Sequence, residues 1–248
     1  MILVLGGTSE ARELAAALYE RGVPVTTSLA GRVTRPRLPP GEVRIGGFGG
    51  PDRLAGWLAA HHVSRVVDAT HPFAERISAS AVAACTEARV PLLRLERPGW
   101  SERPGDCWHW VDDLAGAAAR VPALGERVLL TTGRQGLEAF AALEAWFLIR
   151  CVEQPGPPLP ARHEIVLDRG PYTLEGELAL IDRHRIAVLV TKDSGGGYTS
   201  AKLDAARARG LPVLVVRRPN RPAGDSVGSV EEALTWAGAG AVQAAHPG

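Results

Sequence analysis

The residues of this chain with chemically useful side chains gather in short glycine-rich segments, each directly after an apolar run. The first segment is GGTSEAR at residues 6–12, which follows the apolar run at 2–5. Glycine lets a backbone approach a pyrophosphate closely, and the N-terminus of a following helix offers unbonded N–H groups and a positive dipole end. A full dinucleotide fingerprint would have glycine at position 8, where Thr8 stands. We interpret the segment as a nucleotide-phosphate site rather than a turn that binds nothing, with contacts from Gly6, Gly7, Thr8, Ser9, Glu10 and Arg12.

The segment TTSLAGR at residues 26–32 indicates which nucleotide is bound. It ends the second expected strand, where an NAD site carries an Asp or Glu for the ribose 2′-hydroxyl. This segment has hydroxyl groups and an arginine but no acid, which suits the charge-assisted hydrogen bonds of a 2′-phosphate. The alternative is a solvated loop in an arginine-rich chain. The pattern favours NADP(H) over NAD(H), with contacts from Ser28, Leu29, Ala30 and Arg32.

Two further segments, GGFGG at 46–50 and DATHPFA at 68–74, follow other expected strands of the same half. We predict that Thr70 caps a helix that Pro72 begins, because hydroxyl residues favour the N-cap and proline the first helical position. A lone histidine at a helix start is more often a structural residue, so His71 is predicted to bind first and to donate a proton second. The cofactor contacts expected here come from Gly46, Gly47, Thr70, His71 and Pro72.

The second half of the chain contains two comparable segments, LTTGRQG at 130–136 and TKDSGGGYT at 191–199. The two lysines of the sequence, Lys192 and Lys202, lie in or beside the latter. Arg134 and Lys192, together with backbone N–H groups, would form a wall that attracts anions. This predicts a substrate with several carboxylates or phosphates, bound by Thr132, Gly133, Arg134, Lys192, Ser194, Gly195 and Gly196.

These segments require a framework of alternating strands and helices. Short apolar runs alternate with longer amphipathic runs, which is typical of βαβ units and of a parallel sheet covered on both faces. Residues 97–106 contain two Pro-Gly pairs and interrupt the alternation, so we place a domain boundary there. The prediction is an α/β protein with two Rossmann-like, doubly wound parallel-sheet domains, 1–100 and 101–248, and a cleft between them. The expected strands are 2–5, 23–29, 43–45, 65–69, 91–95, 128–131, 146–152, 164–167, 186–190 and 212–216, and the expected helices are 10–21, 52–60, 72–88, 135–143, 173–183, 200–209 and 230–237.

Composition argues against several classes of protein. The 248 residues include 28 basic and 27 acidic side chains, a net charge near +1, which is unlike a dedicated nucleic-acid binder. No polybasic face stands out, and no apolar run approaches the roughly 18 residues of a membrane span. The three cysteines form no C-x-x-C pair, so we expect reduced thiols. The adjacent His61 and His62 point in different directions, so we expect no metal site. We expect a cytoplasmic protein without nucleic-acid or membrane partners, and its oligomeric state stays open.

Five motifs occur in order over most of the chain: GGTSEAR (6–12), SLAGR (28–32), DATHPFA (68–74), LLTTGRQ (129–135) and KDSGG (192–196). Together they resemble the precorrin-6A reductase family of cobalamin biosynthesis. The resemblance implies NADPH-dependent hydride transfer to one ring double bond of a corrinoid tetrapyrrole to give precorrin-6B, in the cleft between two Rossmann-like domains. The acetate and propionate groups of such a substrate would be attracted by an arginine- and lysine-rich edge. Metal-free and cobalt-loaded substrates stay open, with the metal-free form favoured by analogy.

Three residues are candidates for the catalytic step, Lys192, Asp193 and His71. We expect Lys192 to bind or polarise the substrate and Asp193 to orient Lys192. The proton that accompanies hydride has three candidate sources, which are a side chain, water and the substrate itself.

Two alternative functions are weighed against this one. Tyr198 and Lys202 fit the Y-x-x-x-K spacing of short-chain dehydrogenases, where a lysine one helical turn away lowers the pKa of the tyrosine. The late position of the motif and the different opening glycine pattern argue against it. A non-catalytic NADP(H) sensor would need only the first half, so the charged segments of the second half argue against that function too.

Overall fold

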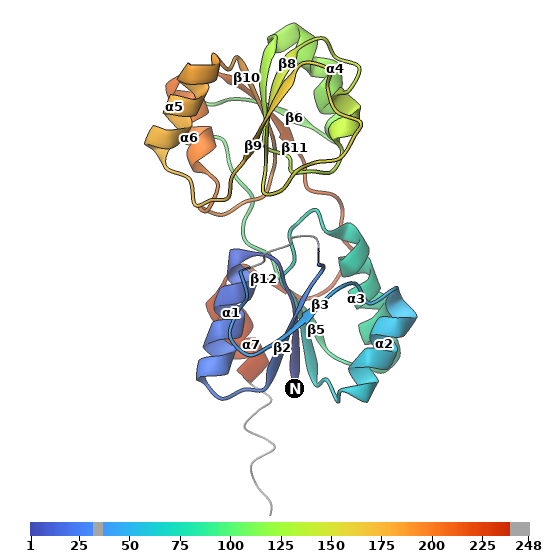
Figure 1. The fold of residues 1–248 in the computed structure, drawn as a ribbon. Coiled ribbons are helices and arrows are strands. Elements are labelled where there is room, and N and C mark those ends of the chain that lie inside the picture. Colours follow the sequence, from blue (N-terminus) through green and yellow to red (C-terminus); the bar gives the residue numbers. More distant parts are fainter. Residues whose placement is uncertain (32–36, 239–248) are drawn as a thin grey trace, which may run out of the picture. The chain divides into compact units, whose positions relative to one another are not determined.

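The computed structural model describes residues 1–31 and 37–238, and they form two compact units (Figure 1). The first unit comprises Met1–Pro98 together with the described residues from Asn220 onward, and the second comprises Gly99–Pro219. The predicted boundary lies two residues from the first crossing, but the assignment of residues 220–238 to the second domain is wrong. The segment returns to the first unit through β12 (Ser226–Val227), which pairs with β5 (Leu92–Leu95). A two-residue strand after a proline-rich stretch leaves no periodic signal in a sequence.

The first unit is built on a six-stranded sheet in the order β12-β5-β4-β1-β2-β3, with every pair parallel. Counted from β1, this is the strand order 3-2-1-4-5-6 of dinucleotide-binding folds, which reverses direction between β1 and β4. The remaining strands are β1 (Ile2–Leu5), β2 (Val25–Leu29), β3 (Glu42–Ile45) and β4 (Arg65–Asp68), and the helices are α1 (Ser9–Glu20), α2 (Pro51–Ala60), α3 (Glu75–Ala88) and α7 (Val230–Gly238).

Helices cover both faces of this sheet, with α1 beside α7 on one face and α2 beside α3 on the other (Figure 1). The alternation of side chains along β1 assigns the two cores. Val4 packs in the cluster with α1 and α7, whereas Leu3 and Leu5 pack in the cluster with α2 and α3. Burial of each such leucine contributes roughly 1.5–3 kcal/mol, so the strand that leads into the first glycine turn is firmly held.

The second unit has a six-stranded sheet in the order β6-β11-β10-β7-β8-β9, again with every pair parallel. Strands β7 to β11 repeat the order of β1 to β5, but the edge strand beside β11 is β6, the first strand of this unit, whereas β12 is the last strand of the first unit. The reversal lies between β7 and β10. Its strands are β6 (Cys107–Val111), β7 (Arg127–Leu130), β8 (Trp146–Cys151), β9 (His163–Leu167), β10 (Val188–Lys192) and β11 (Pro212–Val216), and its helices are α4 (Leu114–Leu124), α5 (Leu174–His184), α6 (Ala201–Ala208) and the 3-10 helix η1 (Leu137–Phe140).

One prediction about the second unit is wrong, and two of its elements were missed. The expected helix at 135–143 is only the four residues of η1, because Gly136 has a φ of +83° and interrupts the backbone just before it. Strand β6 and helix α4 were not predicted, and α4 carries Gly116 and Pro122, which weaken a helical pattern. The predicted fold class, two parallel-sheet α/β units, is confirmed. No helix in residues 1–31 and 37–238 combines the length and the apolar character that crossing a bilayer requires.

Candidate functional site

The turn after β1 begins with two glycines that are required for different reasons. A Cβ on Gly6 would lie 2.9 Å from Thr27 Cγ2 on the neighbouring strand, so packing requires glycine there. Gly7 has a φ of +120°, which L residues rarely adopt, and a Cβ built on it would meet no described atom within 4 Å. The backbone at Gly7 therefore borders open space directly before a helix, as close approach of a pyrophosphate requires.

Thr8 occupies the position where the fingerprint has glycine, and it links two turns. Its Oγ1 accepts a hydrogen bond from the N–H of Ala11 at 3.1 Å, which caps α1. The same hydroxyl donates to the carbonyl oxygen of Ala69 at 2.8 Å. Thr8 thus joins the turn after β1 to the turn after β4, across the point where the strand order reverses.

The first turn of α1 also holds an ion pair. Glu10 Oε2 lies 2.5 Å from Arg97 Nη1 and 3.0 Å from Ser9 Oγ. Glu10 therefore connects α1 to the end of the first unit's main segment. The cofactor contacts predicted for Ser9, Glu10 and the half-buried Arg12 stay predictions.

Arg44 on β3 is a site residue that the sequence analysis did not identify. Its guanidinium donates to the carbonyl oxygens of Gly46 at 2.5 Å and Gly47 at 2.9 Å, and it lies 3.4 Å from Ser28 Oγ. The guanidinium also stacks on the ring of Phe48, 3.8 Å from the centroid. Three predicted residues thus converge on one arginine. The signal in the sequence is an arginine two positions before a glycine pair, on the strand that neighbours Ser28.

The rest of this segment is described only in part. Leu29 is buried at the end of β2, and Ala30 after it is exposed. Arg32, a predicted 2′-phosphate contact, lies outside the described residues.

The turn after β4 is organised by the buried carboxylate of Asp68. Its Oδ1 accepts hydrogen bonds from the hydroxyl and the N–H of Thr70 at 2.6 and 3.1 Å, and its Oδ2 accepts from Ser78 Oγ at 2.6 Å. The prediction that Thr70 caps a helix begun by Pro72 is wrong, because α3 begins at Glu75 and Thr70 bonds back to Asp68. The N-cap position of α3 is Ala74, so Thr70 lies too far before the helix to cap it.

His71 and Pro72 lie in this turn and are fixed from the C-terminal segment. Arg221 donates to the carbonyl oxygens of His71 at 2.6 Å and Pro72 at 3.1 Å. The His71 Nδ1 accepts from the N–H of Phe73 at 3.2 Å, so the neutral ring carries its proton on Nε2. Arg221 is a second residue missed from the sequence, since its contacts span about 150 positions of the chain.

In the second unit, Lys192 ends β10 and is half-buried. Burial lowers the pKa of its ammonium from the ordinary value, and the carboxylate of Glu138 opposes that shift. Glu138 belongs to η1, which follows β7, so the ends of β7 and β10 share one electrostatic environment. This is the point where the strand order of the second unit reverses.

The predicted substrate residues after β7 are close to this point. Arg134 pairs with Glu153 at 3.2 Å and remains about one third exposed. The hydroxyl of Thr132 is buried and has no hydrogen-bond partner among the described residues. Gly133 has a φ of +82° and borders open space within the described chain. The loop thus presents a cation beside an accessible backbone, and an unsatisfied hydroxyl is buried next to them.

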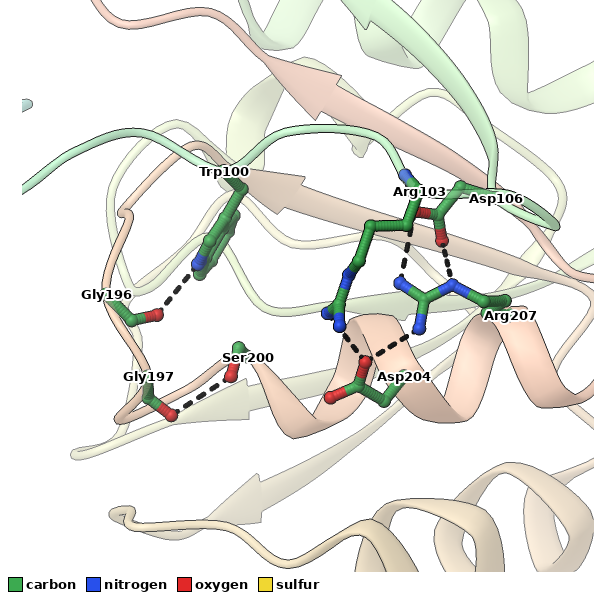
Figure 2. A network of polar contacts seen from close by, with 8 residues as sticks. All are labelled: Trp100, Arg103, Asp106, Gly196, Gly197, Ser200, Asp204 and Arg207. Carbon is green, nitrogen blue, oxygen red and sulfur yellow. Dashed lines mark hydrogen bonds and ion pairs between the residues drawn. The ribbon is translucent and has the colours of Figure 1, made fainter.

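The loop after β10 turns sharply. Ser194 donates its N–H to the carbonyl oxygen of Lys192 at 2.7 Å, and Gly195 and Gly196 have φ values of +66° and +68°. The carbonyl oxygen of Gly196 accepts the indole N–H of Trp100 at 2.8 Å (Figure 2). This loop is therefore pinned by the segment that enters the second unit.

Asp193 has partners other than the predicted one. Its Oδ1 accepts the backbone N–H of Trp100 at 2.9 Å, and its Oδ2 lies 3.2 Å from Arg218 Nε. Both oxygens are engaged by the two segments that join the units, an arrangement that local sequence cannot reveal. The expectation that this carboxylate orients Lys192 stays a prediction.

The Tyr198 and Lys202 pair does not form a dehydrogenase dyad. Tyr198 lies before α6 rather than on it, and its hydroxyl donates to the carbonyl oxygen of Gly170 at 2.8 Å. Lys202 is buried, with its Nζ 5.1 Å from the ring centroid of Trp100. Burial and, to a smaller extent, the charge of Arg150 lower the pKa of Lys202 to about 7, against the attraction of Glu177.

Comparison with known proteins gives one consistent family. Residues 1–238 match the family model described as precorrin-6x reductase CbiJ/CobK. The precorrin-6A reductase of Rhodococcus erythropolis is 55% identical over 240 residues, which cover 96% of this chain and 97% of that protein. The cobalt-precorrin-6A reductase of Priestia megaterium is 31% identical over 250 residues, with coverage of 94% and 96%. A solved structure titled CobK precorrin-6A reductase matches with a TM-score of 0.90 at 43% identity, covering 95% of this chain and 94% of that one.

Proposed function

The chain belongs to the precorrin-6x reductase family of cobalamin biosynthesis, and from this premise we propose that it uses NADPH to reduce one ring double bond of precorrin-6A. A reductase of this kind takes hydride from a nicotinamide cofactor. Hydride adds to one carbon of the double bond and a proton to the other, so the product gains two hydrogens. We assign the cofactor to the first unit and the carboxylates of the corrinoid to the second.

The observation that carries this assignment is the turn after β1. It combines the open backbone at Gly7 with the N-terminus of a 12-residue helix that Thr8 caps. The first N–H groups of a helix have no acceptor within the helix and lie at its positive end, which favours a pyrophosphate. The second unit has only the four-residue η1 at the corresponding place, so it lacks this helix N-terminus.

The preference for NADPH over NADH rests on Ser28 and Arg44. Both lie at the ends of paired strands, where the ribose of a bound dinucleotide is recognised. A guanidinium and a hydroxyl donate to a 2′-phosphate, whereas an NAD site would present a carboxylate. The carbonyl oxygens of Gly46 and Gly47 hold the guanidinium in place before the phosphate arrives.

The side chains of the second unit bind and orient the macrocycle in this proposal. Lys192 and Arg134 supply positive charge, and Thr132 supplies a hydroxyl that needs a partner. Cations bind the peripheral carboxylates and fix which ring double bond is presented. His71, with its proton on Nε2, is assigned to binding beside the cofactor.

Purified protein mixed with precorrin-6A tests the proposal through the absorbance of NADPH and the mass of the product. We expect oxidation of NADPH, little oxidation of NADH, and a product two hydrogens heavier. The same assay with cobalt-precorrin-6A decides between the two substrates. NADPH binding without oxidation in either assay would contradict the reductase and favour a sensor.

The cofactor preference is tested by Arg44→Met, with Arg21→Met at the far end of α1 as its matched control. Loss of a charge-assisted contact costs about 1.5–3 kcal/mol, so the KM for NADPH should rise roughly 10- to 100-fold. The KM for NADH and both constants of Arg21→Met should be unchanged. An equal rise for both nucleotides would contradict a contact of Arg44 with the 2′-phosphate.

A further inference from the structure

The chain passes between the two units twice, at Pro98–Gly99 and at Pro219–Asn220. Both passages meet the second unit at Asp193. Trp100, just after the first passage, donates its backbone N–H to Asp193 Oδ1 at 2.9 Å. Arg218, just before the second, places Nε 3.2 Å from Asp193 Oδ2 and 3.1 Å from the Asp193 carbonyl oxygen. One carboxylate therefore holds the entry and the exit of the second unit together.

The position of this carboxylate is fixed by its surroundings. Asp193 is only 7% exposed, and its N–H donates to the carbonyl oxygen of Val216 at 2.9 Å. A Cβ on Gly99 would lie 2.6 Å from Asp193 Oδ2, so the first passage approaches as closely as glycine allows. Partial burial makes each charge-assisted hydrogen bond stronger than it would be in water.

The entering segment is anchored further along its length. The indole of Trp100 donates to Gly196 and packs on the core of the second unit, and Asp106 pairs with Arg207 at 2.9 Å (Figure 2). Arg103 pairs with Asp204 at 2.8 Å on the exposed side of the same network.

Each passage also has an anchor on the first unit, which two residues separate from the anchor on the second unit. Arg97 pairs with Glu10, and Arg221 holds the carbonyl oxygens of His71 and Pro72. Pro98 and Gly99 separate Arg97 from Trp100, and Pro219 and Asn220 separate Arg218 from Arg221. The anchored residues of the first unit belong to the proposed cofactor site, and Asp193 follows Lys192 directly.

We propose that Asp193 is a positioning residue, which ties both passages to the end of β10 and so sets the geometry in which substrate is reduced. It acts through Trp100 and Arg218 and not by contact with the reacting atoms. The predicted effect on turnover rests on the function proposed above. The contacts of Asp193 with Trp100 and Arg218, called the tie below, do not depend on that function.

Asp193→Asn tests the proposal, because the amide keeps the size of the side chain and loses the ion pair with Arg218. Hydrogen exchange at the Trp100 N–H should accelerate at least 10-fold, since the bond to a charged acceptor is weakened. The kcat for precorrin-6A should fall about 10-fold while the Kd for NADPH and the shape of the pH profile are unchanged. Arg218→Gln should reproduce both effects from the other side of the tie.

The matched control is Asp204→Asn, which removes the ion pairs with Arg103 and Arg207 from the same network and leaves Asp193 intact. If the rate of hydrogen exchange at the Trp100 N–H is unchanged in Asp193→Asn, the tie is overturned. Faster exchange with unchanged kcat would overturn the positioning role, and a displaced pH profile would instead mark Asp193 as a proton donor or acceptor. If the wild-type protein fails to oxidise NADPH, the proposed function and the positioning role fall together, and the exchange rates still decide the tie.

Discussion

Five strands of each unit share one order, but the two units differ at the point where that order reverses. In the first unit, β1 leads through Gly7 into a capped 12-residue helix. In the second, β7 leads into a loop and the four residues of η1, and the neighbouring β10 ends in Lys192. Backbone donors and a helix terminus suit a phosphate, whereas cationic side chains suit carboxylates spread around a macrocycle. In the proposed function, the binding chemistry of each unit therefore follows from the turn after the strand and not from the parallel sheet that both units contain.

The largest expected effect concerns the glycines after β1 and β7, Gly7 and Gly133. Gly7→Ala should raise the Kd for NADPH about 100-fold, because the new Cβ occupies the open side of the turn and φ is strained by roughly 1–3 kcal/mol. Gly133→Ala carries similar backbone strain in the second unit and should leave this Kd unchanged. Isothermal titration with NADPH measures both variants. Equal losses of affinity would show that the second unit also binds the nucleotide.

A smaller effect is expected from Lys192→Met, which removes the proposed substrate charge from the second unit. We expect kcat/KM for precorrin-6A to fall about 30-fold, the equivalent of roughly 2 kcal/mol. The Kd for NADPH should not change, and Arg120→Met on the exposed side of α4 serves as the control. Steady-state kinetics provide the measurement, and an unaltered rate would remove Lys192 from the site.

The smallest expected effect is on the pH dependence of stability, to which the cores of the two units contribute with opposite sign. Lys202 has a folded-state pKa of about 7 against an ordinary value of 10.5, so the unfolded chain binds more protons in that range. Its contribution to stability is therefore fully present above pH 10.5 and is lost as the pH falls towards 7, with a slope of at most about 1.4 kcal/mol per pH unit. In the first unit, burial and then Asp68 raise the pKa of Cys85 from 9.0 to about 12, so its contribution is present below pH 9 and is lost as the pH rises.

Lys202→Met should therefore stabilise the second unit at pH 7 and flatten the rise in its stability between pH 7 and 9. Urea unfolding followed by far-UV circular dichroism across this range provides the test. Lys192, whose pKa is also lowered, contributes with the same sign, so part of the slope should remain in the variant. A slope identical to that of the wild-type protein would show that Lys202 stays charged in its buried position.

The sequence predicted those parts of the fold that are encoded locally. The strands of both sheets before the glycine turns were predicted within a few residues, because continuous apolar runs mark buried parallel strands. Arg44 was missed although Ser28 was identified, since the pairing of β2 with β3 brings them together. Thr70 was given the wrong partner because α3 begins at Glu75 and not at Pro72, which leaves the Thr70 hydroxyl to donate to Asp68. The roles of Asp193 and Arg221 depend on contacts across much of the chain, and the predicted cleft stays a prediction.

Because β12 is the last strand of the first unit, the ribosome completes the first unit only after it has synthesised the second. The second unit is in effect an insertion between the fifth and sixth strands of the first, so all of its residues are synthesised before β12 and α7 emerge. Until then, the face of β1 that packs with α1 lacks Ala233, Leu234 and Ala237, which complete its apolar cluster. The nascent first unit thus exposes apolar surface while the second unit already has its full set of strands. A nascent chain stalled before residue 226 holds one finished unit and one open sheet.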